Sequence, residues 1–133
     1  MNLIEVGFKK GFKPKLTDEG TSGTYFMRGP AKRPLAVFKP IDEEAFAPHN
    51  PRDHVAPFGS ETFRAGVLSG EACIREVAAY ILDHDGFSGV PETTLLSLQD
   101  DSLRKWKFST LHIKDEEKKD FLTQITQIVL PER

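Results

Sequence analysis

Hydrophobic and polar positions along one short segment predict a strand that ends on a lysine. Leu35, Val37 and Lys39 fall on one face of this segment, and Ala36 and Phe38 fall on the other. Because both faces are apolar as far as position 38, the segment is typical of a buried strand. Its ammonium group is then expected to continue an apolar face. A solvated strand end, with the lysine stem covering apolar surface, is the alternative.

The residues before this strand predict a hairpin and a loop with unusual chemistry. Thr24–Met27 is aromatic and β-prone, and residues 28–34 contain the glycine and prolines of a turn. The preceding loop is Gly20-Thr21-Ser22-Gly23-Thr24. Its two glycines and three hydroxyl groups can bring backbone N–H groups close to an anion. Kinase small lobes hold ATP with such a loop at one end of a hairpin and an inward lysine on the next strand. An ordinary surface loop is the alternative.

An apolar repeat at helical spacing predicts a helix over Gly70–Asp83. The stripe at i, i+3, i+4 and i+7 consists of Ile74, Val77, Ala78 and Ile81. Ser69 is the predicted N-cap, and Glu71 is expected to pair with Arg75. Glu76 lies on a different flank, beside small alanines that let another element approach closely. Most helical glutamates face solvent, which is the alternative for this residue.

Weaker patterns complete an α+β prediction. Leu3–Phe8 favours a short strand, and the proline-rich residues 40–69 exclude a long regular element. Thr93–Leu98 and Leu103–Ile113 predict a pair of strands, and Asp115–Leu130 has the apolar stripe of a second helix. The predicted fold is therefore a small antiparallel sheet with one packed helix and an extra C-terminal helix.

Composition and charge narrow the classes of function. The 133 residues suit a single domain, and a net charge of −2 provides no electrostatic case for nucleic acid as a partner. The single cysteine, Cys73, rules out an internal disulfide, and no apolar run approaches the length of a transmembrane segment. His49 and His54 stand in a proline-rich loop without convergent ligands, so no metal site is predicted. The expected location is the cytoplasm, with peripheral membrane contact left open.

Five separated motifs, in a fixed order, resemble a known family. They are Gly20–Phe26, Ala36–Glu44, Ala47–Pro51, Gly70–Tyr80 and Gly89–Pro91. This succession resembles the small lobe of the type II phosphatidylinositol 4-kinases, and within them the plant-like gamma branch. The match covers about residues 20–96, which the resemblance marks as a protein-kinase-like small lobe. Residues 97–133 diverge and are expected to form a strand and a helix.

The resemblance implies a role for each matched position. Gly20 to Thr24 would cover the phosphates of Mg-ATP, Lys39 would contact its α- and β-phosphates, and Glu76 would pair with that lysine. Positioning and charge stabilisation are most of what phosphoryl transfer requires of a protein. Asp42-Glu43-Glu44 matches a stretch of the family for which no chemical role is evident.

The departures from the family are equally informative. A phosphotransferase of this class needs an aspartate at the acceptor and residues that hold magnesium, all from a large lobe. No asparagine follows Asn50, so the catalytic loop cannot be present and the chain alone is predicted to be inactive. The first hypothesis is therefore an ATP-binding small lobe, its acceptor a phosphoinositide or a protein. The alternative hypothesis is a non-catalytic kinase remnant that binds a protein partner, and a truncated gene product is a third possibility.

Overall fold

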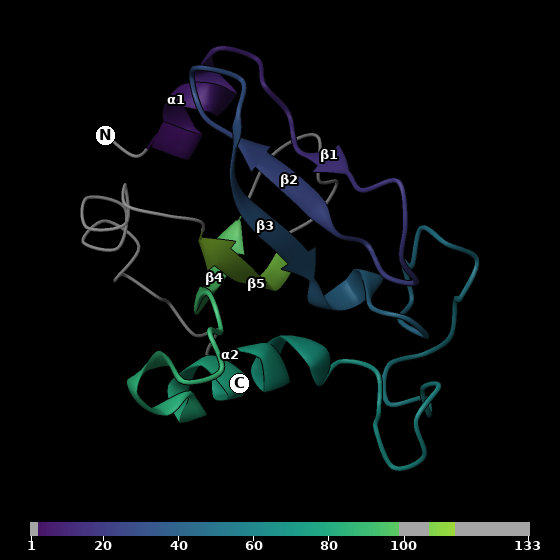
Figure 1. Cartoon of the computed structure of the whole chain (residues 1–133). Coiled ribbons are helices and arrows are strands. Elements are labelled where there is room, and N and C mark those ends of the chain that lie inside the picture. The colour runs from purple at the N-terminus through teal and green to yellow at the C-terminus, as the bar shows by residue number, and fades with distance from the viewer. Residues whose placement is uncertain (1–2, 99–106, 114–133) are drawn as a thin grey trace.

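Residues 3–98 and 107–113 are described by the computed structural model, and they form an α+β fold (Figure 1). Within these residues, five antiparallel strands make one sheet in the order β1-β2-β3-β5-β4. The strands are β1 (Lys15–Leu16), β2 (Tyr25–Arg28), β3 (Pro34–Pro40), β4 (Glu92–Leu98) and β5 (Lys107–Ile113). The helices are α1 (Leu3–Lys9) and α2 (Ala72–Leu82), with short 3-10 helices η1 (Ile41–Glu43) and η2 (His84–Gly86).

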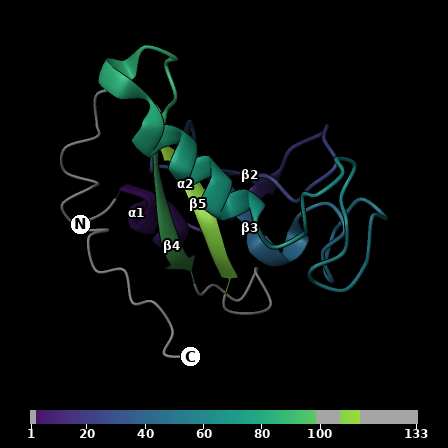
Figure 2. The same ribbon diagram turned by 90° about the horizontal axis from the view of Figure 1, so that it is seen from below.

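Strand β3 has a different environment on each of its two faces. Phe38 and Ala36 are buried with Ile4 of α1 and Met27 of β2, and these four residues form the main core cluster. The opposite face contains Lys39 and is only partly buried. Helix α2 lies on this second side of the sheet, where it contacts β4 and β5 (Figure 2). The alternation predicted for β3 is thus confirmed, and it directs Lys39 toward α2.

The first element is a helix, so the strand predicted over Leu3–Phe8 is wrong. Ile4, Gly7 and Phe8 share one helical face at i, i+3 and i+4, and this face packs toward β2. A Cβ atom on Gly7 would lie 2.0 Å from the carbonyl oxygen of Arg28. The glycine therefore allows α1 and β2 to approach each other closely, a contact that local propensity does not reveal.

Helix α2 forms within the predicted residues, but only part of its apolar stripe is buried. Ile74 and Ile81 of the predicted stripe are 60% and 72% exposed. Cys73 is buried, and Glu76, Val77, Ala78 and Tyr80 are half-buried. Polar contacts that Glu76 and the first turn make with distant residues set the rotation of the helix. The spacing of apolar residues in the sequence carries no information about such contacts. Of the predicted apolar stripe, Val77 and Ala78 are therefore half-buried, whereas Ile74 and Ile81 face solvent.

The start of α2 also differs from the prediction. Ser69 is not the N-cap, because α2 begins at Ala72 with Glu71 in the N-cap position. Ser69 is buried and belongs to the preceding turn, where its N–H donates to the carbonyl of Ser60 at 2.9 Å. The predicted pair of Glu71 with Arg75 is present, with 2.8 Å between Oε2 and Nη2.

The remaining elements agree with the sequence pattern where they are described. Residues 40–69 contain only η1 and two isolated bridges, Ala47–Val55 and Glu61–Leu68, so the predicted absence of a long regular element is confirmed. β5 pairs with β4 as predicted, but it also pairs with β3 and so lies between them. Residues 103–106 of the predicted strand, and the helix predicted over Asp115–Leu130, lie outside the described residues.

Candidate functional site

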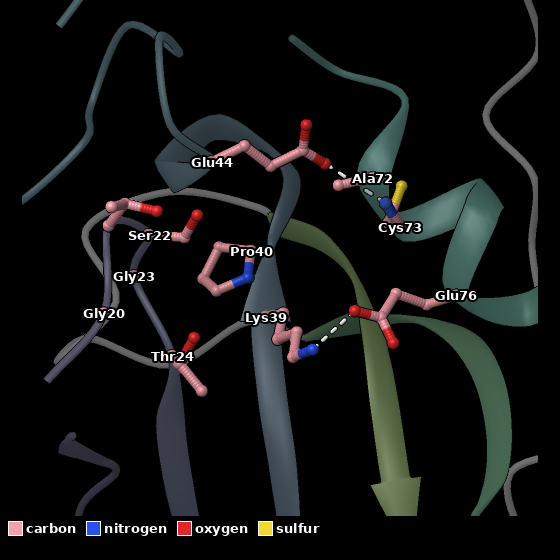
Figure 3. A pocket seen from close by; sticks show the side chains of 11 residues that line it. Gly20, Ser22, Gly23, Thr24, Lys39, Pro40, Glu44, Ala72, Cys73 and Glu76 are labelled. Atoms are coloured by element: carbon pink, nitrogen blue, oxygen red, sulfur yellow. Dashed lines mark hydrogen bonds and ion pairs between the residues drawn. The ribbon is translucent and has the colours of Figure 1, made fainter. Parts of the chain in front are cut away.

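A cavity of about 240 Å³ lies between the loop before β2, the end of β3 and the start of α2 (Figure 3). All of the candidate residues line it: Gly20, Thr21, Ser22, Gly23, Thr24, Lys39 and Glu76. Pro40, Glu44, Ala72 and Cys73 complete the lining and were not predicted. The fold therefore brings the sequence-predicted candidates to one place.

Lys39 and Glu76 form an ion pair across the cavity. Nζ of Lys39 lies 2.5 Å from Oε1 of Glu76, and Figure 3 shows the two side chains pointing toward each other. The side chains are 34% and 32% exposed. Because a partly exposed pair contributes only about 0–1 kcal/mol to stability, its main effect is on where the ammonium group is held.

The loop Gly20–Thr24 is bonded to the chain that follows β3. The N–H of Gly23 donates to the carbonyl of Glu43 at 2.8 Å, and the N–H of Ala45 donates to Ser22 Oγ at 3.1 Å. A Cβ atom on Gly23 would lie 2.1 Å from Oε2 of Glu43. Gly23 thus allows close packing on η1, while its own amide is used inside the protein and does not point to a ligand.

Buried Asn50 connects this loop to the residues around η1. Its Nδ2 donates to the carbonyls of Thr21, Glu43 and Glu44 at 2.8, 3.1 and 3.0 Å. Its Oδ1 accepts from the backbone N–H groups two and four residues later, at 2.8 and 3.1 Å. One amide side chain therefore satisfies five backbone groups, which fixes the loop without help from a ligand.

The loop is held at its N-terminal end as well. The guanidinium group of Arg52 donates to the carbonyls of Thr17 and Asp18, at 3.2 Å for the second. The N–H of Thr17 in turn donates to the carbonyl of Thr24 at 2.8 Å, closing the loop across its base. Gly20, at the turn, has φ of +111°, a backbone conformation that favours glycine.

The acidic stretch Asp42-Glu43-Glu44, for which the sequence indicated no role, makes three separate connections. Asp42 Oδ2 lies 2.9 Å from Nδ1 of His49. Glu43 is buried and accepts a 2.6 Å hydrogen bond from the hydroxyl of Tyr25. Burial chiefly, and then the charge of Asp42, raise the pKa of Tyr25, so the hydroxyl stays a donor.

Glu44 connects the same stretch to α2. Its Oε2 accepts from the N–H of Gly70 at 2.7 Å and its Oε1 accepts from the N–H of Cys73 at 3.1 Å. Desolvation by burial raises the pKa of Glu44 despite these bonds from backbone N–H groups. Burial and the nearby Glu44 charge raise the pKa of Cys73 to about 11, so its thiol stays protonated.

Sequence reasoning missed Glu44 and Asn50 for an identifiable reason. Glu44 acts on residues 26 and 29 positions away, and Asn50 reaches a loop carbonyl 29 positions away. The available signals were an acidic run directly after a strand and an asparagine inside a proline-rich segment. Neither signal identifies the partner, because only the fold brings these segments together.

In the described part of the chain, no three histidine, cysteine, aspartate or glutamate side chains group in a way that could hold a metal ion. The ring of His54 instead packs at an angle against those of Phe46 and Phe63, with ring centroids 5.8 and 5.2 Å away. The described helices include none with the length and apolar character that a bilayer crossing requires.

Comparison with known proteins finds this chain similar to a region of phosphatidylinositol 4-kinase gamma proteins. It is 44% identical over 101 residues to phosphatidylinositol 4-kinase gamma 4 of Oryza sativa subsp. japonica, and the match covers 68% of this chain and 18% of the relative. It is 43% identical over 103 residues to phosphatidylinositol 4-kinase gamma 4 of Arabidopsis thaliana, with the same coverage. Phosphatidylinositol 4-kinase gamma 6 of Arabidopsis thaliana is 40% identical over 98 residues, covering 73% and 16%.

These matches are regional. The chain spans less than a fifth of the length of these curated relatives. No protein-family model matches it. The homologues therefore support a relationship to phosphatidylinositol 4-kinase gamma proteins, in line with the resemblance, while the activity of those longer proteins is not thereby assigned to this chain.

Proposed function

We propose that this chain is the ATP-binding small lobe of a phosphatidylinositol 4-kinase-like phosphotransferase. The observation that carries the proposal is the Lys39–Glu76 ion pair, which faces one cavity together with the loop Gly20–Thr24. Protein kinases require this combination, in which a strand lysine paired with a helix glutamate lies near a glycine-containing loop. The homologues, whose names are those of phosphatidylinositol 4-kinases, support the same class of function.

The order of elements supports a kinase-like small lobe. The loop lies between β1 and β2, Lys39 lies on the third strand, and Glu76 lies on the helix between the third and fourth strands. This order corresponds to the arrangement in which kinases place their phosphate loop, their strand lysine and their helix glutamate. Because β5 pairs with both β3 and β4, we treat residues 20–96 and the divergent residues 97–133 as parts of a single domain.

The residues that line the cavity fit a nucleoside triphosphate. Lys39 supplies a positive charge that Glu76 holds in place before any ligand arrives, and this preorganisation favours phosphate binding. Thr21 and Thr24 line the same cavity, and their hydroxyl groups would serve as further donors. The cavity of about 240 Å³ lies just below the range of about 300–1,000 Å³ for small-molecule sites. This cavity would then be one part of a larger cleft that a second lobe completes.

Mg-ATP would supply the phosphoryl group, and the chain would supply position and charge. Its residues bind and orient phosphates, but the aspartate and the magnesium ligands that a kinase needs are expected from a large lobe. We therefore infer that the chain alone transfers no phosphate. The acceptor in the assembled protein is a phosphoinositide or a protein hydroxyl.

Thermal unfolding with and without Mg-ATP tests the proposal. A ligand at about 100 times its Kd stabilises the native state by about 2.7 kcal/mol, so millimolar Mg-ATP is expected to raise the Tm by several degrees. Lys39→Met is expected to abolish this rise while changing the free energy of unfolding without nucleotide by less than about 1 kcal/mol.

The matched control is Lys32→Met, because Lys32 lies over the ring of Phe12 rather than in the cavity. This variant is expected to keep the full Tm rise. If the native chain shows no Tm rise at millimolar Mg-ATP, or if Lys39→Met keeps it, the proposed function is wrong.

A protein-binding role is the second candidate, and a different observation favours it. The outer side of α2 and the turn after it expose large apolar side chains: Ile74, Ile81, Leu82 and Phe87. Clusters of this kind on a surface mark interaction sites more often than isolated exposed residues do. A protein partner covering α2 would explain them. The Mg-ATP titration separates the two candidates, since a remnant that binds only a protein gives no Tm rise.

A further inference from the structure

We propose that Glu44 is a positioning residue, which fixes the first turn of α2 relative to the loop Gly20–Thr24 and thereby holds Glu76 at Lys39. The contacts of Glu44 stand on their own, whereas the effect on nucleotide affinity rests on the proposed function. The resemblance assigned no role to this position.

The first step of the argument is where the carboxylate of Glu44 binds. It accepts hydrogen bonds from Gly70 and Cys73, at 2.7 and 3.1 Å, on either side of the start of α2. Helix N-termini leave backbone N–H groups without intrahelical partners, and the N-cap residue of α2 makes no side-chain cap. A side chain from the residues after β3 therefore does the work of a cap, which a local residue usually does.

The second step is that Glu44 is itself held on the loop side of the cavity. Its carbonyl accepts from Asn50 Nδ2 at 3.0 Å, and the next N–H, of Ala45, donates to Ser22 Oγ at 3.1 Å. Asn50 also binds the carbonyl of Thr21. Glu44 thus connects the two walls of the cavity (Figure 3).

The third step is the distance along α2. Cys73 and Glu76 are three residues apart, so their Cα atoms are separated by about 4.5 Å along the helix axis and lie on the same side. A displacement of the first turn therefore moves Glu76 with it. Because the Lys39–Glu76 pair is partly exposed, water competes for it, and a fixed helix is needed to keep it formed.

The electrostatic environment of Glu44 is consistent with this role. The side chain is buried, and burial raises its pKa even though backbone N–H groups of Gly70, Ala72 and Cys73 lower it; the charge of Glu71 raises it further. Desolvation therefore outweighs the hydrogen bonds, so the carboxylate stabilises the fold less than the protonated group would. Its two bonds to the start of α2 and its place in the cavity lining are what indicate a positioning role.

Hydrogen exchange tests the geometric part without any ligand. Glu44→Gln has nearly the same shape but can accept only one of the two bonds well, because its NH₂ group faces a backbone N–H. Exchange at the amide of Cys73 is expected to accelerate about tenfold, the effect of losing about 1.4 kcal/mol, while amides of β3 keep their rates. Unchanged exchange at Cys73 would overturn the inference, whether or not the chain binds Mg-ATP.

Nucleotide affinity tests the link to Glu76. Glu44→Gln is expected to weaken Mg-ATP binding about tenfold without lowering the Tm at pH 7. In a Glu76→Gln background the same substitution is expected to have no further effect, because the group it positions is already gone. Additive effects would show that Glu44 acts independently of Glu76 and would contradict the inference.

Glu71→Gln is the matched control, because Glu71 is also a carboxylate at the start of α2 but binds Arg75 at the surface. It is expected to leave the affinity for Mg-ATP and the exchange rate at Cys73 unchanged. An effect as large as that of Glu44→Gln would show that the loss of any negative charge near the start of α2 is enough, and this would overturn the inference. Failure of the native chain to bind Mg-ATP overturns the proposed function only, and the exchange result then decides the role of Glu44.

Discussion

The two walls of the cavity are held in place by different interactions. The loop wall, Gly20–Thr24, is fixed by a network of backbone groups around buried Asn50. The helix wall, α2, meets the rest of the site through two carboxylates, Glu44 at its first turn and Glu76 one turn later. Its outer side is apolar and exposed at Ile74.

This difference indicates which wall can move. The loop wall is held by hydrogen bonds inside the protein, so its position does not depend on a ligand. The helix wall packs on β4 and β5, but at the cavity it is held by one capping carboxylate and one ion pair that water can reach. A nucleotide in the cavity or a protein on the outer side of α2 would therefore act mainly on the helix.

The largest effect is expected from a substitution at the centre of the loop wall. Asn50→Ala removes five hydrogen bonds of a buried side chain and leaves the N–H groups of Arg52 and His54 without this acceptor, so it is expected to lower the free energy of unfolding by about 3 kcal/mol. Urea denaturation measures the change. Thr62→Ala, whose hydroxyl bonds only within its own turn at 3.4–3.5 Å, is the control and should cost less than about 0.5 kcal/mol. A loss below about 1 kcal/mol for Asn50→Ala would contradict a fixed loop wall.

A smaller effect is expected from crowding the same wall. Gly23→Ala places a Cβ atom 2.1 Å from Oε2 and 2.6 Å from Cβ of Glu43, so the loop must separate from η1. The expected cost is about 2 kcal/mol of unfolding free energy. Gly59→Ala is the control for backbone strain alone, since φ is +80° with nothing within 4 Å, and about 1 kcal/mol is expected. Equal costs at the two glycines would show that Gly23 is not tightly packed.

The smallest effect concerns the helix wall and its pH dependence. The pKa of Glu44 is raised in the folded state, so that state binds more protons than the unfolded state above pH 4.5. Glu44 is therefore expected to contribute more to stability as the pH falls from 7 toward 4.5, and its contribution is lost as the pH rises through the folded pKa.

The free energy of unfolding of the native chain minus that of Glu44→Gln, measured by urea denaturation at several pH values, isolates this contribution. Glu71, which faces Glu44 from α2, and Lys39 and Glu76, which line the same cavity, are unchanged in both proteins. A difference that shrinks on acidification would contradict the raised pKa.

Much of this site can be predicted from local sequence patterns, and the predictions that failed did so for physical reasons. Strand alternation directs Lys39 to the partly buried face, and helical periodicity locates the residues that form α2. The same periodicity did not show that Ile74 and Ile81 face solvent, because ion pairing and capping by residues far away in sequence set the rotation of the helix. For α1, the apolar residues of Leu3–Phe8 favoured a strand, whereas the helix that forms there depends on a close contact of Gly7 with the carbonyl of Arg28.

The sequence by itself determined which side chains stand on which face of β3, where α2 forms, and which small and hydroxyl residues precede β2. These properties depend on neighbours within about one turn or one strand, so a pattern contains them. Only the tertiary structure decided that α2 turns Glu76 inward, that Glu44 caps it, and that Asn50 fixes the loop. Those contacts join residues 26 to 37 positions apart, and their geometry exists only once the sheet has formed.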